Sequence, residues 1–118
     1  MPSEIDHPRY SKEEYRRRYR EIRSQMCERG LDVLIMYGDS GSHGGNQANI
    51  KYVSNYKDPV CSFIVFPLKG DPALYMSNRL YLPYAKQMSV IRRTEAVDYE
   101  PGKKVEQRIR ALGLEKGN

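Results

Sequence analysis

Four apolar residues near the start of the chain recur at intervals of four, three and four positions, which places them on one face of a helix. They are Tyr15, Tyr19, Ile22 and Met26. Ser11 lies before this segment, and Glu14 follows it at the spacing of a capping box. Gly30 can adopt the left-handed conformation that ends many helices. The pattern predicts an amphipathic helix over residues 12–29.

Two later segments are apolar at nearly every position, which is typical of short strands that are covered on both faces. They are residues 32–37 and 61–66. A turn signal at residues 69–72 and alternating residues over 73–77 follow the second segment, so it forms an antiparallel hairpin with them. Residues 49–53 and 90–94 are predicted as two further short strands.

Two more helices are expected after the hairpin. Pro83 must lie in the first turn of a helix within residues 78–88, because a proline further inside would break it. Three apolar residues share one face of a second helix over residues 103–112. They are Val105, Ile109 and Leu112. Helices that feed buried strands in this order indicate an α/β layering.

The composition suits one soluble domain, with 118 residues of which 39% are hydrophobic and 30% are charged. Residues 1–10 are expected to be a flexible lead-in, and residues 11–118 a single domain. The net charge is +5, but glutamates intersperse the arginines of the first helix, which indicates a solvated face rather than a nucleic-acid site. The sequence predicts neither a membrane span nor a secretory signal. Cys27 and Cys61 are expected to be reduced thiols of a cytoplasmic protein.

The glycine-rich segment Gly38–Ala48 holds the residues most suggestive of catalysis. Its Gly-Asp-Ser sequence follows a buried strand and resembles the motif of an esterase class. Ser40 would need a base and an orienting acid to become a nucleophile, and the nearby base is His43 in the same loop. The alternatives are an ordinary surface loop or a lid over a neighbouring pocket. No group of residues has the spacing of a metal site, so none is predicted.

Two motifs occur in order on either side of this loop. The first consists of Met26, Glu28, Gly30, Leu31, Asp32 and Leu34, and the second of Asn49, Ile50, Tyr52, Ser54 and Tyr56. An apolar hairpin over residues 60–77 and a helix that ends in Gly-Leu come later. Together they resemble the amino-terminal domain of the creatinase, prolidase and Xaa-Pro aminopeptidase family, over roughly residues 11–118.

The resemblance implies a mixed central sheet of about five strands with helices on both faces, of the ribonuclease H-like type, and a chain truncated before a last strand. It also implies that catalysis belongs to a "pita-bread" domain absent from this chain. That domain would hold two divalent metal ions of the Mn, Co or Zn type and would act on a peptide or small amide. The chain itself would hold no cofactor and no catalytic residue.

Further implications of the resemblance concern partners and loops. The parent enzyme would be a homodimer, and the loop with Tyr56 and Lys57 would approach the partner's substrate. An exposed turn is the alternative for both residues, and Tyr52 is expected to pack under the sheet. A protein-binding module of the histone-chaperone type, in which a basic helix meets an acidic partner, is the alternative to an enzyme domain, and the Ser40 esterase is a third hypothesis.

Overall fold

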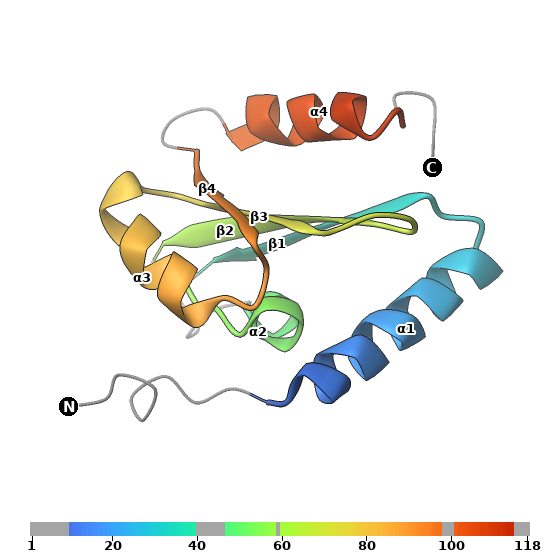
Figure 1. Cartoon of the computed structure of the whole chain (residues 1–118). Coiled ribbons are helices and arrows are strands. Elements are labelled where there is room, and N and C mark those ends of the chain that lie inside the picture. Colours follow the sequence, from blue (N-terminus) through green and yellow to red (C-terminus); the bar gives the residue numbers. More distant parts are fainter. Residues whose placement is uncertain (1–9, 40–46, 59, 98–100, 115–118) are drawn as a thin grey trace.

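The computed structural model describes residues 10–39, 47–58, 60–97 and 101–114. Its elements are α1 (Lys12–Glu28), β1 (Val33–Asp39), α2 (Ala48–Ser54), β2 (Cys61–Pro67), β3 (Ala73–Met76), the 3-10 helix η2 (Arg79–Tyr81), α3 (Leu82–Met88), β4 (Arg93–Ala96) and α4 (Pro101–Ala111). The sheet order is β1-β2-β3-β4, with antiparallel pairs except for the parallel pair β3–β4. The α/β prediction of a mixed sheet between helices is confirmed (Figure 1).

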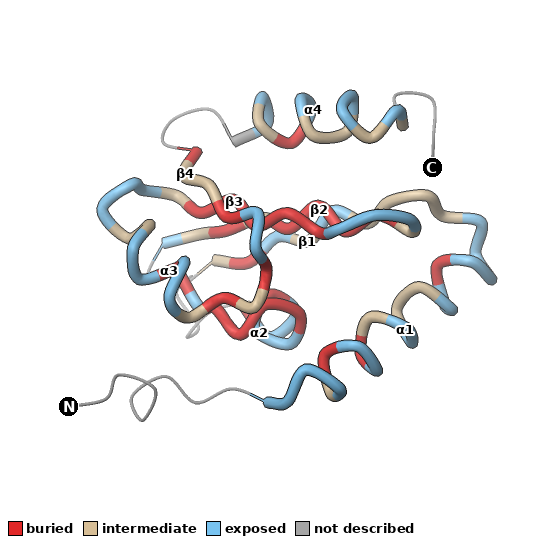
Figure 2. The backbone as a smooth tube through the Cα atoms, in the orientation of Figure 1, coloured by how far each residue is buried: buried red, intermediate tan, exposed pale blue. Residues whose placement is uncertain are grey.

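Helices cover both faces of the sheet, and side chains of the central strands alternate between the two layers. Ile64 and Phe66 of β2 pack with the layer that includes residues of α1, α2 and α3, whereas Val65 packs with Val105 of α4. The strand β3 does the same, with Leu74 in the first layer. Figure 2 shows the buried positions concentrated on these strands. Unbroken apolar runs are therefore required in the centre of this sheet.

Local signals set the ends of the two longer helices. The side chain of Ser11 accepts a hydrogen bond from the Glu14 amide at 3.1 Å, as the capping box predicts. Gly30 has a φ of +68°, and the Leu31 amide bonds back to the carbonyl of Met26 at 2.9 Å. Gly113 ends α4 in the same way. The predicted first and last helices are confirmed, with α4 beginning two residues earlier than expected.

The predicted strand at residues 49–53 is wrong, because this segment is the helix α2. Ile50 and Val53, three positions apart, are buried against the first layer, so the helical period governs its packing. The described residues consequently form four strands rather than about five. Tyr52 is 39% exposed, so its expected packing under the sheet is also wrong.

Two smaller expectations also differ from the structure. The fourth strand spans Arg93–Ala96 rather than residues 90–94, because Ile91 leaves the strand to enter the core. Pro83 does lie in the first turn of α3, as predicted. The expected lead-in lies largely outside the described residues, since only Tyr10 of it is described. Within the described part of the chain, no helix is long and apolar enough to cross a membrane.

One arginine of α1 is buried, although the arginines of this helix were expected on a solvated face. Arg18 donates to Glu14 Oε2 at 2.8 Å and to the carbonyl of Tyr52 at 2.7 Å. Its guanidinium also lies over the rings of Tyr52 and Tyr10, with distances of 4.2 and 4.5 Å to the ring centroids. These contacts join α1 to α2, so Arg18 is part of the scaffold.

Glu14 is held in its charged form by two guanidinium groups. Hydrogen bonds from Arg17, and then from Arg18, lower the pKa of Glu14 from 4.5 to about 2. A carboxylate whose pKa is lowered by folding stabilises the folded state above its unfolded pKa, and this contribution is lost as the pH falls through the folded pKa. Glu14 therefore stabilises the protein above pH 4.5, and this stabilisation fades toward about pH 2.

We expect the variant Glu14→Gln to melt at a lower temperature than the wild type at neutral pH. The difference between the two melting temperatures should shrink as the pH falls below 4.5. Thermal unfolding followed by circular dichroism over a pH series measures it. Glu13→Gln is the matched control, since it removes a charge from the same turn without these bonds. The same pH dependence in both variants would contradict the assignment.

Candidate functional site

The second motif comprises most of α2 and part of the turn that joins α2 to β2 at one end of the sheet. Asn55 ends α2 with a φ of 68°, a left-handed conformation that asparagine tolerates better than most residues. Its side-chain amide donates to the carbonyl of Met88 at 3.0 Å, and the Val90 amide donates to the carbonyl of Ser54 at 2.9 Å. The turn is thereby tied to the end of α3.

Asp58 is the centre of a buried hydrogen-bond network in this turn. It is 1% exposed, and its Oδ2 accepts from the Tyr56 hydroxyl at 2.6 Å. Its Oδ1 accepts from the amides of Val60 and Cys61 at 2.7 and 3.0 Å, and from the Ser77 hydroxyl at 3.0 Å. A buried carboxylate is costly unless donors satisfy it, and here four donors do so.

Gln47, the residue that precedes α2, stabilises the same turn. Its side-chain amide donates to the Asp58 carbonyl at 2.6 Å and accepts from the Asp58 amide at 2.8 Å. A side chain that pairs with both backbone groups of one residue replaces a rung of a sheet ladder. Gln47 is 4% exposed, so this residue of the glycine-rich segment Gly38–Ala48 is buried.

The Tyr56 hydroxyl and the Cys61 thiol at this turn are unreactive at neutral pH. Burial, and then the hydrogen bond to Asp58, raise the pKa of the Tyr56 hydroxyl well above its usual value. Partial burial, followed by the nearby carboxylates of Asp58 and Asp39, raises the pKa of the Cys61 thiol. A protonated phenol and a protonated thiol are poor nucleophiles. The network is therefore suited to holding the backbone in place rather than to transferring a group.

The structure gives the motif residues separate structural roles. Ile50 is fully buried, Tyr52 carries Arg18 on its ring, and the Ser54 hydroxyl links the carbonyl of Ile50 to the amide of Tyr56. The Asn49 side chain accepts from the amide of Ile50 at 2.8 Å. These contacts explain why these residue types suit the segment.

Tyr56 and Lys57 differ sharply in exposure. Tyr56 is fully buried, so the alternative of an exposed turn is wrong for it, whereas Lys57 is exposed. Exposed apolar side chains belong to the same end of the sheet: Val60 is 51% exposed, and Tyr84, whose ring centroid lies 5.9 Å from that of Tyr56, is 45% exposed. We call Lys57, Val60, Leu80 and Tyr84 the turn surface; Leu80 is 79% exposed.

The described residues give the esterase hypothesis no geometric support. Ser40 and His43 lie outside the described residues. Asp39 ends β1, and its Oδ1 is buried without a hydrogen-bond partner among the residues described. Within the same residues, no three His, Cys, Asp or Glu side chains group as a metal site would require. Cys27 and Cys61 are both free thiols.

Asp58 and Gln47 were missed by reasoning from sequence, and only one of them had a usable signal. Aspartate accepts from amides two and three residues ahead in turns, which is what Asp58 does with Val60 and Cys61. Gln47 pairs with a residue eleven positions away, a distance that no local rule covers.

We expect Asp58→Ala to lower the free energy of unfolding by about 3 kcal/mol, because it leaves buried donors without an acceptor. Asp58→Asn should cost less, since one oxygen remains to accept from the two amides. Urea unfolding measures both. Lys57→Ala is the control for an exposed neighbour and should stay within about 0.5 kcal/mol of the wild type. A loss for Asp58→Ala no larger than that of the control would refute the role of the network.

Comparison with known proteins places this arrangement in a family. The family described as "Creatinase/Prolidase N-terminal domain" matches residues 18–118. No curated protein matches the chain. A solved aminopeptidase P, an Xaa-Pro aminopeptidase from Streptococcus thermophilus, has 20% sequence identity and a TM-score of 0.61, over 86% of this chain and 70% of that one.

Two further solved structures share the fold. One is a "Creatine_N Superfamily domain" of a dipeptidase from Streptococcus thermophilus, with 16% identity and a TM-score of 0.56 over 82% of this chain and 66% of that one. The other is the Creatinase/Prolidase N-terminal domain of an X-Pro dipeptidase from Streptococcus pyogenes, with 17% identity and a TM-score of 0.54 over 81% and 66%. Because the family match spans most of its length and these structures share its fold, the chain belongs to the Creatinase/Prolidase N-terminal domain family.

Proposed function

We propose that this chain is the non-catalytic amino-terminal domain of a metal-dependent hydrolase of the Xaa-Pro aminopeptidase, prolidase or creatinase type. The observation that carries the proposal is the buried Tyr56–Asp58 network, in which the titratable side chains of both residues fix a turn. The family match and the similarity to domains of Xaa-Pro peptidases support the same assignment.

Catalysis in the parent enzyme is assigned to a separate "pita-bread" domain with two divalent ions of the Mn, Co or Zn type. Residues 11–118 act as one accessory domain beside it. The substrate is a peptide or a small amide, and the parent is a cytoplasmic homodimer. Support for placing the metals elsewhere comes from Asp58 and Glu14, two acidic residues of this domain whose carboxylates are engaged in hydrogen bonds and an ion pair.

The turn surface is the part of this domain that we assign to closing the substrate site and to the dimer. Exposed aliphatic and aromatic side chains beside a lysine can cover a peptide or another subunit. Lys57 is the exposed member of the predicted pair, and a hydrogen bond joins its two chain neighbours, Tyr56 and Asp58. Tyr56 therefore acts as a positioning residue, and Lys57 approaches the substrate.

The chain alone is expected to have no hydrolytic activity. Incubation with an Xaa-Pro dipeptide and Mn²⁺, Co²⁺ or Zn²⁺ should release no proline, and these ions should shift the melting temperature by no more than about a degree, because a protein that binds no ligand gains no stability from it. Proline release and differential scanning fluorimetry measure the two effects. Metal-dependent cleavage by this chain, at a rate proportional to its concentration, would refute the proposal.

In the parent enzyme, Lys57→Ala should raise the KM for an Xaa-Pro peptide by about twofold to fivefold, the worth of one exposed charge contact. The kcat should change less, and the melting temperature should not change. Lys69→Ala is the matched control, since Lys69 is also exposed but follows the opposite end of β2. Equal kinetics for both variants and the wild type would remove the turn surface from the substrate site.

A further inference from the structure

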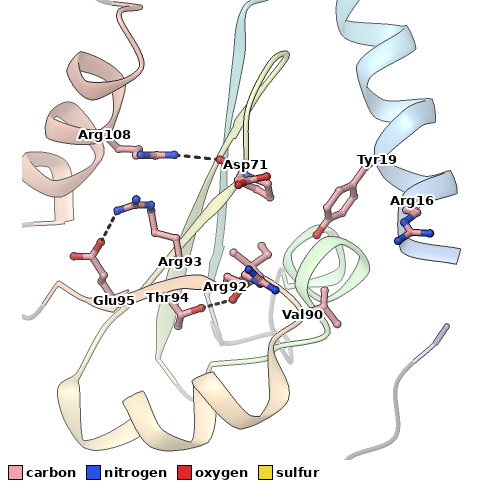
Figure 3. Close-up of a pocket in the computed structure, with 11 residues that line it drawn as sticks. Arg16, Tyr19, Asp71, Val90, Arg92, Arg93, Thr94, Glu95 and Arg108 are labelled. Atoms are coloured by element: carbon pink, nitrogen blue, oxygen red, sulfur yellow. Dashed lines mark hydrogen bonds and ion pairs between the residues drawn. The ribbon is translucent and has the colours of Figure 1, made fainter. Parts of the chain in front are cut away.

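A large cleft lies away from the turn surface, between α1 and the edge of the sheet at β4. Its main cavity of about 780 Å³ is bounded by α1, by the turn between β2 and β3, by β4 and by α4 (Figure 3). A second cavity of about 580 Å³ shares Arg16, Tyr19, Val90, Ile91 and Arg92 with the first, so the two adjoin one another. We call the joint hollow the basic cleft. The volumes of the two adjoining cavities suit an extended ligand better than a single small ion.

The lining of the basic cleft is strongly cationic. Six cationic side chains border it: Arg16, Arg92, Arg93, Arg108, Lys12 and Lys86. Two carboxylates, Asp71 and Glu95, oppose them. A hollow lined by one sign of charge concentrates ligands of the opposite sign.

Several of these cations have hydrogen-bonding capacity to spare. Arg16 and Arg92 form no ion pair with any residue that the structure describes, whereas their α1 neighbour Arg17 pairs with both Glu14 and Glu21. The Arg108 Nε is buried and has no partner in the described residues, and its guanidinium makes only a long contact of 3.4 Å to the Asp71 carbonyl. Guanidinium groups suit carboxylates, which can accept two parallel bonds from them.

Part of the remaining lining is apolar. Tyr19, Val90 and Ile91 belong to both cavities, and the Tyr19 hydroxyl is already engaged by the carbonyl of Val53 at 2.7 Å. The ring of Tyr19 and the side chain of Val90, which are both partly exposed, therefore offer apolar surface between the arginines. A ligand that matches the whole lining carries carboxylates and aliphatic side chains on one extended chain.

We propose that the basic cleft binds an acidic, extended segment of a partner protein, with its carboxylates at Arg16, Arg92 and Arg108 and its aliphatic side chains on Tyr19 and Val90. This function is separate from the proposed accessory role in a hydrolase and uses no residue of the turn surface. The volume of the cleft and the apolar part of its lining favour a peptide over inorganic phosphate, which would use the charges alone.

The test uses three short fluorescein-labelled peptides: alternating Glu and Val, Glu alone, and alternating Lys and Val. Fluorescence anisotropy at low salt should show binding of the Glu-Val peptide, weaker binding of the Glu peptide and none of the Lys-Val peptide. Binding should weaken as salt is raised, because the contacts are between exposed charges. No binding of the Glu-Val peptide, or equal binding of the Glu peptide, would overturn the proposal, as would full displacement by inorganic phosphate at the same concentration of charge.

Charge reversal locates the binding. Arg16→Glu with Arg92→Glu should weaken binding of the Glu-Val peptide by about tenfold, since two favourable contacts become unfavourable. The matched control is Arg29→Glu with Lys51→Glu, which makes the same change of net charge at exposed positions outside the cleft and should weaken binding by less than about twofold. Equal weakening in both pairs would mean that only net charge matters and would refute the site. Because the assay involves no hydrolase activity, its failure would leave the accessory role standing.

Discussion

The fold depends on the burial of β2 and β3 on both faces. Each strand sends alternate side chains into two separate layers, such as Phe66 toward α1 and Val65 toward α4. Neither layer can be removed without exposing a row of apolar side chains to water, so the helices on opposite faces are coupled through the strands they share. The helices carry polar side chains of the domain. Because the sheet fixes the positions of the helices, it also fixes the positions of these side chains.

The hydrogen bonds at this end of the sheet are organised around one buried carboxylate, that of Asp58. Asp58 collects donors from β2, from the segment after β3 and from Tyr56, and Gln47 clamps its backbone. A connection between a helix and a strand is usually the mobile part of a domain, but these bonds fix this one. A fixed turn can present Lys57 and its apolar neighbours in a constant arrangement, which an accessory domain needs if it is to complete a site built elsewhere.

Two nearby arginines of α1 have different roles because the helix directs their side chains to different sides. Arg16 and Arg18 are two positions apart, which separates their directions by about 200° around the helix axis. Arg18 lies against the ring of Tyr52 in α2 and pairs with Glu14 of its own helix, while Arg16 lines the basic cleft without an ion pair in the described residues. An excess of positive charge that looks uniform in the sequence is therefore divided between the scaffold and an open surface.

Sequence alone determined the features that depend on contacts within a few residues. The ends of α1 and α4, the hairpin of β2 and β3, and the place of Pro83 in α3 all follow from local spacing, and the order of the motifs was enough to indicate the family. The tertiary structure decided the state of residues 48–54. Their apolar side chains fit an alternating strand as well as a short helix, and the packing of Ile50 and Val53 in the first layer selected the helix.

The same limit explains the candidate site. That Asp58 lies in a turn follows from its neighbours, but its burial, and that of Tyr56 beside it, required Ser77 from the segment after β3 and Gln47 from before α2. The basic cleft joins α1 to β4 and α4, which are far apart in sequence. Spacing rules describe neighbours along the chain, whereas these arrangements exist only after the sheet has brought distant segments together, because burial and charge pairing depend on proximity in space.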